Sequence, residues 1–417
     1  MAGDLKEIYH LFNPDKALSN EDLINYYVEV DKNEENLVEL KVRLELGLET
    51  REPIKLLFTG HRGSGKTTAL NQLVTRLNDR FFIVNYSVFD LLDYNDITYT
   101  DVLLSILTKM LEKAQNEKID LGDSLGKRAE KWRSSIIKTT TSEKVKDGSI
   151  GLNLPLKFIE IMGRMKSETT TRIEVRKEIE PRISELISII NDTISEIERT
   201  GKQVLVIIDN LEKIDIIKAL TLFYEHGTQL TQPICKILYT FPISLKSSEK
   251  FMQIRINFSD VIIHPNIKIN EKDGRPYTKG RGFMKEIVSK RVPVNLFEPA
   301  ALNYIIDMSG GVVREFIRII RDSAVRAIAK EKKSISKDIA VDVVNGLKNL
   351  YLAQLSSSDY EVLSTVCCNK DIKRDERLVG LLHNLSVLEY KNAESWCDLN
   401  PIVRSIMEER NLLTIQL

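Results

Sequence analysis

The sequence predicts an α/β fold in which a parallel sheet is covered by helices on both faces. An apolar run at residues 55–60 leads into a segment with helical spacing, and the same order repeats with a run at residues 80–88 and a helix from about Thr100. A third run, Gln203–Lys213, is continuously apolar up to an acid, as in a strand buried on both faces. Residues 236–242 resemble a further central strand. Strands alternating with helices are typical of parallel sheets.

Composition and charge are those of an ordinary globular protein. The chain has 417 residues, 42% apolar, and its 60 Lys and Arg balance 60 Asp and Glu. A net charge of zero gives no global sign of a nucleic-acid or membrane partner. Four cysteines form no metal or redox spacing and lie in apolar segments, which favours small core residues in a reduced cytoplasmic protein. No stretch reaches the ~18 apolar residues of a spanning helix, and the opening is no signal peptide, so we expect a soluble protein.

A glycine-rich loop follows the first strand. Its pattern is G-x-x-x-x-G-K-[ST], and the flanking strand and helix supply the context that this phosphate-binding motif needs. Glycine allows φ > 0 and a close approach of backbone N–H groups to a polyphosphate, and the next helix adds its positive dipole end. Lys66 would neutralise β- and γ-phosphate oxygens, and the Thr67 hydroxyl would help to hold Mg²⁺. The predicted binding residues are Gly60, His61, Arg62, Gly63, Ser64, Gly65, Lys66, Thr67 and Thr68.

Two later strand ends complete the predicted site. Asp209 ends the third strand beside the loop, where open α/β sheets bind ligands, and we expect it to order the Mg²⁺ shell. Glu212, one turn further, is the candidate to orient or deprotonate an attacking water. Thr240 ends the next strand and could sense the γ-phosphate, although a plain strand-end threonine is an alternative.

A separate helical segment could close over this site. After a Gly-Gly turn, a helix would aim Arg314 at the phosphates across a cleft; a surface arginine is the alternative. Residues 1–50 form a loop-like opening with a turn at Asn13-Pro14, then a helix ending near Leu46. This leader could cover the base of a nucleotide or simply pack before the first strand.

Two stretches before the third strand complete the core region. Residues 117–173 form a basic insertion that interrupts the alternation: residues 124–182 carry 14 Lys and Arg but only eight Asp and Glu. We favour a flexible insertion with solvated charges over an arm that meets a polyanion, a membrane or a neighbouring subunit. Residues 175–197 then predict one long helix, which Gly201 would cap.

The C-terminal residues predict a winged helix-turn-helix. Residues 266–283 read as a loop, helices follow to about Leu352, and from Ser358 the order is helix, helix, a two-stranded wing around Asn392-Ala393 and a short helix from Pro401. The expected recognition helix opens at residues 373–377 with three positive and two negative charges, a weak footprint for DNA. A protein-docking or autoinhibitory module is equally compatible, with His383 packed rather than catalytic.

The motifs G-H-R-G-S-G-K-T-T, V-I-I-D-N-L-E-K, Y-T and S-G-G-V-V-R-E together resemble P-loop ATPases of the AAA+/STAND superfamily, near the origin-recognition and initiator-like branch and bacterial ATPases of defence or mobile-element operons. The resemblance implies Walker A residues Lys66 and Thr67, Walker B residues Asp209 and Glu212, sensors Thr240 and Arg314, and the cofactors ATP and Mg²⁺. It also implies self-association with an arginine acting in trans, for which Arg255 and Arg291 are candidates.

Domains and function follow as expectations. We predict a leader (1–50), a P-loop ATPase core (51–265), a helical lid (266–352) and a winged-helix-like domain (353–417). The function expected is an ATP-binding and ATP-hydrolysing AAA+/STAND-type switch that assembles or recruits an effector encoded elsewhere, in a bacterial defence or mobile-element system. The alternatives are an ATP-gated DNA-binding initiator or transposition-type loader, and a scaffold that binds ATP structurally. Asn210 departs from the family pattern, because an amide directly after Asp209 cannot act as a base, and it predicts slow hydrolysis unless Glu212 substitutes.

Overall fold

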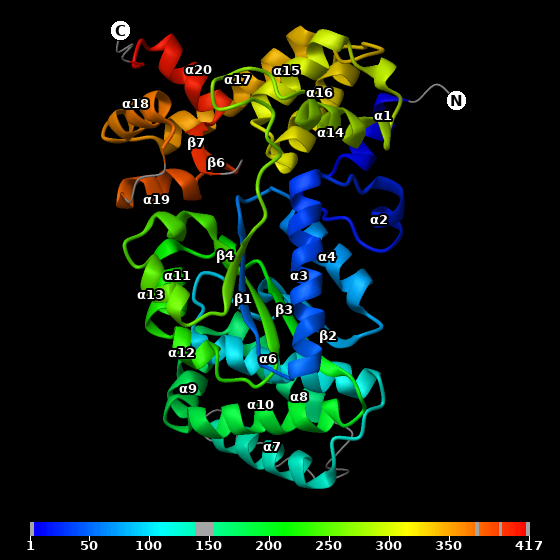
Figure 1. Cartoon of the computed structure of the whole chain (residues 1–417), viewed down its shortest axis with the longest axis vertical. Coiled ribbons are helices and arrows are strands. Elements are labelled where there is room, and N and C mark those ends of the chain that lie inside the picture. The colour runs from blue at the N-terminus through cyan, green and yellow to red at the C-terminus, as the bar shows by residue number, and fades with distance from the viewer. Residues whose placement is uncertain (1–3, 138–153, 372–374, 392–393, 414–417) are drawn as a thin grey trace.

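A five-stranded parallel sheet forms the centre of the computed structural model, which describes residues 4–137, 154–371, 375–391 and 394–413 (Figure 1). The strand order is β2-β3-β4-β1-β5, and every neighbouring pair is parallel. The strands are β1 (Lys55–Gly60), β2 (Phe81–Ser87), β3 (Gln203–Asp209), β4 (Lys236–Pro242) and β5 (Asp260–Ile263). The predicted α/β class with a parallel sheet is confirmed.

The sheet is covered on both faces because successive side chains of a strand point to opposite sides. Leu56 and Phe58 of β1 pack with α3 (Asp31–Thr50) and α4 (Lys66–Leu77). Leu57, between them, belongs to the larger core on the other face. This larger core includes α5 (Val88–Leu91) and α6 (Tyr99–Asn116).

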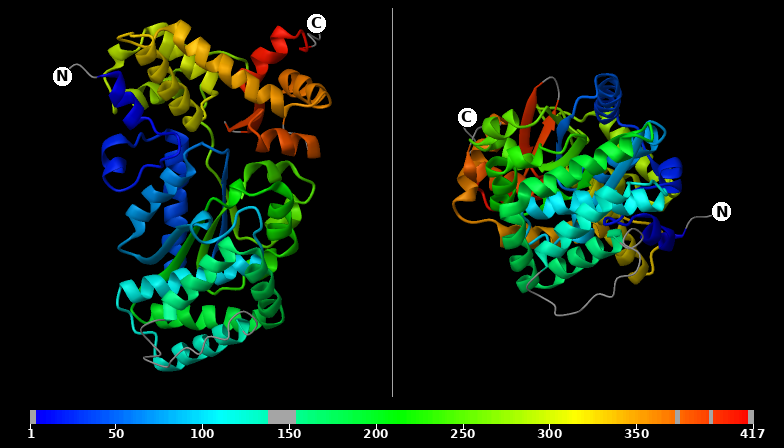
Figure 2. Two further views of the ribbon diagram at one scale, coloured as in Figure 1. Left: turned by 180° about the vertical axis from the view of Figure 1, so that it is seen from behind. Right: turned by 90° about the horizontal axis from the view of Figure 1, so that it is seen from below.

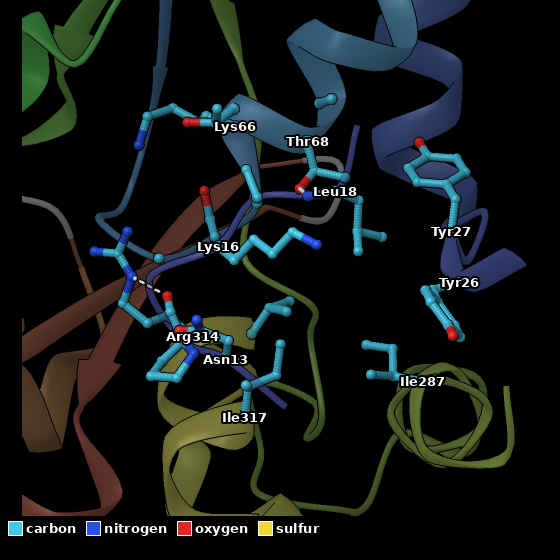
Figure 3. Close-up of a pocket in the computed structure, with 18 of the residues that line it drawn as sticks. Asn13, Lys16, Leu18, Tyr26, Tyr27, Lys66, Thr68, Ile287, Arg314 and Ile317 are labelled. Atoms are coloured by element: carbon cyan, nitrogen blue, oxygen red, sulfur yellow. Dashed lines mark hydrogen bonds between the residues drawn. The ribbon is translucent and has the colours of Figure 1, made fainter. Parts of the chain in front are cut away.

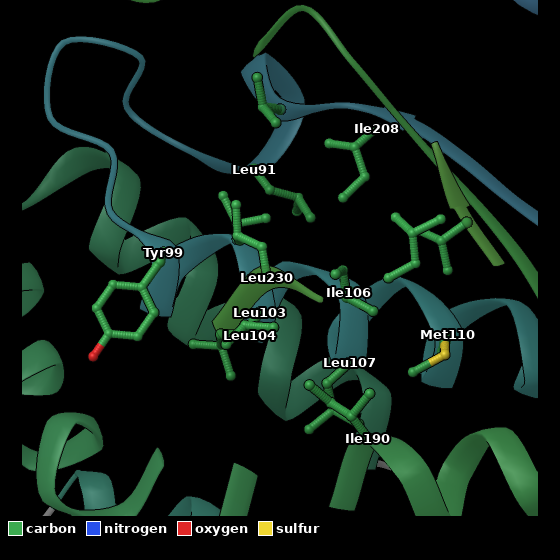
Figure 4. Close-up of a cluster of buried hydrophobic side chains, with 14 of the residues drawn as sticks. Leu91, Tyr99, Leu103, Leu104, Ile106, Leu107, Met110, Ile190, Ile208 and Leu230 are labelled. Carbon is green, nitrogen blue, oxygen red and sulfur yellow. The ribbon is translucent and has the colours of Figure 1, made fainter. Parts of the chain in front are cut away.

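Helix α6, which the sequence predicts from about Thr100, is buried on all sides over most of its length. Leu103, Ile106 and Leu107 are fully buried, and so are Leu104 and Thr108 on its other sides. The reason is a second helical layer, in which α8 (Leu154–Ser167) and α10 (Ile183–Glu198) pack against α6 (Figure 4). A helix enclosed between a sheet and further helices needs apolar side chains in every direction.

The basic insertion is helical over its described residues, contrary to the expected flexible segment. It contains α7 (Asp123–Ile136), α8 and α9 (Thr169–Ile179), and residues 138–153 lie outside the description. Apolar side chains anchor it, with Trp132 stacked on Phe158 at a centroid distance of 6.4 Å. Its charges are partly structural: Arg172 is 5% exposed and pairs with Asp93 and Asp96. Arg176, on the next turn, pairs with Asp96 and Asp101.

The single helix predicted over 175–197 is two helices. Between α9 and α10 lies the 3₁₀ turn η1 (Glu180–Arg182), with Pro181 near its start. Proline lacks the N–H that would continue α9 and is well tolerated in the first turn of a helix.

Short elements connect the last three strands at the edge where the predicted site lies. They are η2 (Leu211–Lys213), α11 (Ile216–Leu220), the π-helical η3 (Thr221–Glu225), α12 (Gly227–Leu230), η4 (Ile243–Ser247) and α13 (Phe251–Ile256).

A second helical body lies at one end of the sheet, opposite to α7–α10 (Figures 1 and 2). The loop predicted over 266–283 is shorter, because α14 already begins at Thr278. The elements of this body are α14 (Thr278–Ser289), η5 (Val294–Leu296), α15 (Pro299–Ser309), α16 (Val313–Ala329) and α17 (Lys337–Gln354).

The leader joins this helical body and is not loop-like. It forms α1 (Leu5–Leu11) and α2 (Glu21–Tyr26), and α1 packs on α16. Leu5, Ile8 and Phe12 share one hydrophobic core with α14–α17, and Arg321 lies 4.1 Å from the centre of the Tyr9 ring. The leader therefore connects the helical body to the sheet.

The C-terminal residues show the predicted order of elements, while the winged-helix assignment itself stays a prediction. They form α18 (Asp359–Asn369), α19 (Glu376–His383), the antiparallel pair β6 (Val387–Lys391) and β7 (Ser395–Leu399), and α20 (Pro401–Glu409). Part of the expected recognition segment, 372–374, and the hairpin tip, 392–393, lie outside the described residues. We call residues 358–413 the C-terminal module. Its helix α19 packs on η4 of the sheet body.

Two smaller observations complete the comparison with the sequence. None of the four cysteines, all of which lie within the described residues, forms a disulfide; Cys235 and Cys397 are buried as expected, but Cys368 is exposed. Among the described helices, none has both the length and the apolarity needed to cross a bilayer.

Candidate functional site

The glycine-rich loop lies between β1 and α4, as its motif predicts. Gly65, the N-cap of α4, has φ 101°, which only glycine adopts without strain. Gly60 does not have the expected positive φ. Glycine is needed there because a Cβ would collide with the backbone oxygen of His264. We call residues 60–68 the phosphate loop.

Lys66 lies on the floor of this loop and is 4% exposed. Its Nζ donates to the backbone oxygens of Gly60 and His61, both at 2.9 Å. The same nitrogen is 3.3 Å from Glu212 Oε1. The carboxylate predicted as a base is therefore the ionic partner of the loop lysine.

Asp209 and Thr67 meet at the end of β3. The Thr67 hydroxyl donates to Asp209 Oδ2 at 2.6 Å. Burial and the charge of Glu212 raise the pKa of Asp209. Burial would also raise the pKa of Glu212, but Lys66 and Lys213 outweigh it and hold that pKa below its ordinary value.

Asn210, the residue directly after Asp209, lies in a left-handed turn. Asn210 has φ 70° and ψ 7°, the left-handed region in which asparagine is favoured among non-glycine residues. Its Nδ2 donates to Ser87 Oγ at the end of β2. The left-handed turn leads into η2 and brings Glu212, rather than residue 210, to Lys66.

Thr240 is fully buried and supports this turn. Its Oγ1 accepts from Leu211 N at 2.9 Å and is 3.3 Å from the backbone oxygen of Ile208. Its hydroxyl thus holds the turn that carries Glu212, and its predicted sensor role stays a prediction.

Arg314 lies at the start of α16, where the helical body α14–α17, which the sequence predicts to be a lid, meets the loop. Its backbone N–H donates to Gly63 O at 3.0 Å, and its Nε donates to Pro14 O at 3.1 Å (Figure 3). The start of α16 is therefore in direct contact with the phosphate loop, as the prediction of a separate helical segment required.

A cavity of about 280 Å³ opens between the phosphate loop, the leader and the lid. Lys16 and Leu18 of the leader lie between Lys66 and Thr68 on one side and Ile287 and Ile317 on the other (Figure 3). Leu18 N donates to Thr68 Oγ1 at 3.2 Å. The leader is a packed segment at α1, which lies in the core of the helical body α14–α17. The segment after α1 lines the cavity, and its role in covering a nucleotide base stays a prediction.

The first two variable residues of the phosphate loop face the C-terminal module, not the cavity. Glu389 N of β6 donates to His61 Nε2 at 2.6 Å. Arg62 Nη2 donates to Lys213 O at 2.9 Å and to His383 Nε2 at 2.6 Å. His383 is thus packed, as predicted, but against the loop itself. Burial together with Lys66 lowers the pKa of His61 to about 3, and burial together with Arg62 lowers that of His383 to about 4.

The two arginines proposed to act in trans differ in position. Arg255 is exposed on α13. Arg291 lies in the cavity of its own chain, with its guanidinium 5.1 Å from the centre of the Tyr26 ring, and burial lowers its pKa to about 10. Arg291 therefore lines the cavity of its own chain in this conformation, and its role in trans stays a prediction.

Sequence reasoning missed several groups at the cavity. Lys16, Asn33, Lys213 and His264 all line it. His264 follows β5, whose apolar run Val261-Ile262-Ile263 was the available signal. Asn33 and Lys16 lie on polar segments without any motif.

Comparison with protein families supports the loop assignment. Residues 35–238 match the profile described as "KAP family P-loop domain". This segment is a P-loop NTPase domain. It contains the phosphate loop, Asp209 and Glu212, while the lid and the C-terminal module lie outside the match. No match was found among the curated proteins.

Solved structures resemble the chain over most of its length at low identity. The Aeropyrum pernix ORC2 protein is 12% identical over 97% of both chains, with a TM-score of 0.44. Cdc6p from Pyrobaculum aerophilum is 12% identical over 96% of this chain and 98% of its own, with a TM-score of 0.44. The Thermotoga maritima RuvB Holliday junction branch migration motor is 13% identical over 84% and 78%, with a TM-score of 0.35. At such scores the assignment rests on the family match and the geometry.

Proposed function

We propose that this chain is an ATP-binding and ATP-hydrolysing switch of the AAA+/STAND type that assembles with further copies or recruits an effector encoded elsewhere. The observation that carries the proposal is the convergence of Lys66, Thr67, Asp209 and Glu212 at the carboxyl edge of the parallel strands, beside one cavity. A defence or mobile-element setting rests on the motif resemblance alone.

The charges around the cavity suit a triphosphate. Lys16, Lys66, Lys213 and Arg314 line it, and Lys66 and Arg314 now donate to backbone oxygens. Phosphate oxygens are stronger acceptors than peptide carbonyls, because hydrogen bonds between charged groups are shorter and stronger. A bound triphosphate would therefore draw both side chains away from their present partners.

The opposite end of the cavity suits a base. Tyr27, Ile287 and Ile317 form apolar walls there, and the leader and lid supply them jointly. Nucleotide pockets combine such walls with a few polar groups. Binding would fasten the lid to the sheet body through one ligand.

The residues near Asp209 fit Mg²⁺. Thr67 and Asp209 offer a hydroxyl and a carboxylate 2.6 Å apart, and Mg²⁺ prefers oxygen ligands and completes its shell with phosphates and water. When bound, the ion would neutralise charge on the phosphate oxygens.

Glu212 is the proposed catalytic base. Its lowered pKa keeps it ionised, and its Oε2 has no hydrogen-bond partner within the described parts of the chain. When Lys66 turns to the phosphates, Glu212 is left free to accept a proton from water. The roles of Thr240 and Arg314 are to hold the Glu212 turn and to fasten the lid.

The C-terminal module supports a resting, autoinhibited state. Besides its contacts to His61 and Arg62, the module forms the ion pair Lys246–Glu389 at 2.5 Å, in which Glu389 is buried and Lys246 partly exposed. Ser248 Oγ also donates to Glu376 at 3.2 Å, so the start of α19 is occupied by the sheet body. The alternative, an ATP-gated DNA-binding initiator, requires α19 to leave this position. Exposed Arg255 is the remaining candidate for an arginine supplied to a neighbouring copy.

Nucleotide binding by the full chain tests the proposal. We expect wild type to bind MgATP and Lys66→Ala to lose at least about 100-fold in affinity, because a charge-assisted phosphate contact is lost. Lys127→Ala, on the exposed face of α7, is the matched control. Equal MgATP affinity of wild type and Lys66→Ala would reject the assignment. ATP-dependent DNA binding with a steep salt dependence would favour the initiator alternative.

A further inference from the structure

His264 touches the phosphate loop from outside the motif. It follows β5, and its backbone N–H donates to the backbone oxygen of Thr59 in β1 at 2.6 Å. The side chain then turns back toward the loop, with Nε2 3.2 Å from Ser64 O. The ring is 4% exposed and packs near Phe58, at a centroid distance of 5.7 Å. No motif includes this residue.

The imidazole is neutral, so it carries a single N–H. Burial and the nearby Lys66 lower the pKa of His264 to about 3. A proton on Nδ1 would be buried without an acceptor, since Nδ1 has no partner anywhere in the described chain, and Nε2 would then face Ser64 O with two acceptors opposed. The geometry therefore assigns the proton to Nε2, which donates to Ser64 O.

This tautomer also decides the orientation of Asn33. Asn33 lies on the first turn of α3, and its amide nitrogen is 3.4 Å from His264 Nε2. If Nε2 carries the proton, this arrangement places two hydrogen-bond donors against each other. Amide oxygen and nitrogen are exchanged by a half turn, after which the oxygen faces the imidazole N–H. The Asn33 NH₂ group then takes the other position, which is buried, borders the cavity and has no partner among residues 4–137, 154–371, 375–391 and 394–413.

The carbonyl of Ser64 controls the next N–H. In a planar trans peptide, C=O and N–H point in opposite directions. Holding Ser64 O against the outer wall therefore turns the Gly65 N–H toward the concave side of the loop, where a phosphate would lie. A Cβ on Gly65 would lie 3.7 Å from His264 Nε2, so the ring is adjacent to this peptide.

We propose that His264 is a positioning residue for phosphate binding: it fixes the Ser64–Gly65 peptide so that its N–H faces the ligand, and it orients the Asn33 amide to donate to the same ligand. The inference rests on the proposed nucleotide-binding function and adds two residues to it. It identifies the segment after β5 as the outer wall of the phosphate loop.

Four variants of the full chain test the proposal, with MgATP affinity, turnover and thermal stability as readouts. We expect His264→Ala to weaken MgATP binding about tenfold, because one oriented donor is lost. His264→Gln keeps an N–H at similar reach and should stay within about threefold of wild type. Asn33→Ala should weaken binding by about three- to tenfold. His226→Gln, a half-buried histidine stacked on Tyr99, is the control and should leave affinity unchanged.

Two outcomes would overturn the inference. If wild type binds MgATP but His264→Ala binds equally well, His264 does not position the loop. If His264→Ala and His264→Gln lose affinity and melting temperature together, the ring acts only through packing.

The ratio of wild-type to His264→Ala affinity should stay constant from about pH 6 to pH 8, because the ring is already neutral. A ratio that falls as pH rises would indicate a charged imidazole and reject the tautomer. Failure of wild type to bind MgATP would instead reject the proposed function.

Discussion

The phosphate loop has two sides that are built from different groups. On the side of the cavity, Lys66 and Thr67 are held by oxygen atoms that a ligand could replace. On the opposite side, His61 and Arg62 are held by the C-terminal module. A single short loop therefore meets both the cavity and the module. The comparison teaches that ligand binding and module docking can be tested separately, by changing side chains on opposite sides of one loop.

The largest expected effect lies on the cavity side. Glu212→Gln should lower ATP turnover about 100- to 10 000-fold while MgATP binding is retained, because a general base is lost but the phosphate contacts remain. Single-turnover kinetics with the full chain measure this. Glu225→Gln, an exposed glutamate on η3, serves as the control. Undiminished turnover would remove Glu212 from the mechanism.

The next effect lies on the module side. Glu389→Ala breaks the partly buried pair with Lys246 and should cost about 1.5–3 kcal/mol, because it removes a hydrogen bond between charged groups. We expect faster hydrogen exchange in η4 and α19. Glu361→Ala, in a largely exposed contact with Arg377, should leave exchange unchanged. Unchanged exchange in the Glu389 variant would mean that the docked arrangement does not depend on this pair.

A smaller effect separates the two sides directly. Arg62→Ala should weaken docking by about 1–3 kcal/mol, since it removes a charged donor to His383 and to Lys213 O. MgATP affinity should stay within about threefold, because the Arg62 side chain does not line the cavity. Limited proteolysis and nucleotide titration report the two quantities. A loss of affinity as large as that of Lys66→Ala would show that both sides bind the ligand.

The smallest expected effect is the weakening of module docking at acidic pH. Burial and Arg62 hold the pKa of His383 at about 4 in the docked state, below its ordinary value near 6.5. The undocked or unfolded chain therefore binds more protons between these values, so docking is fully stable above about pH 6.5 and weakens as the pH falls toward 4. Hydrogen exchange of α19 across this range measures the change. The pH dependence of exchange that is due to His383 should be absent in His383→Gln. If wild type and this variant show identical pH profiles, His383 does not cause the weakening of docking in acid.

Site residues could be predicted from the sequence chiefly where a motif follows a buried strand. Asp209 ends β3, and Lys66 follows β1 through the phosphate loop, so a parallel sheet places both at the same edge. The structure does place Thr67 against Asp209. Their catalytic roles stay predictions. The contact of His61 with Glu389 joins residues 328 positions apart and has no periodic signal, so it required the packed structure.

The errors have related causes. Helices α1 and α2, of 7 and 6 residues, are too short to be stable by propensity and form because they pack against the rest of the chain. Helices α7–α9 were hidden by their charges, of which Arg172 and Arg176 proved to be internal partners of aspartates. The break at Pro181 was visible in the sequence but was overridden by a continuous apolar spacing.

The left-handed turn at Asn210 bears on how such sites should be recognised. A rule that counts positions after the strand-end aspartate would score this chain as lacking its acid. Backbone geometry gives another answer, since one residue at φ 70° reverses the path and makes the third position, not the first, the one nearest the lysine. Glycine at position 210 should then keep the turn and lose only the hydrogen bond to Ser87 Oγ. Valine or isoleucine should disturb the turn, because β-branched residues are poorly tolerated at positive φ. Sequence patterns for relatives of this chain should therefore accept, at the position after the aspartate, residues that tolerate a positive φ, and should not require an acid there.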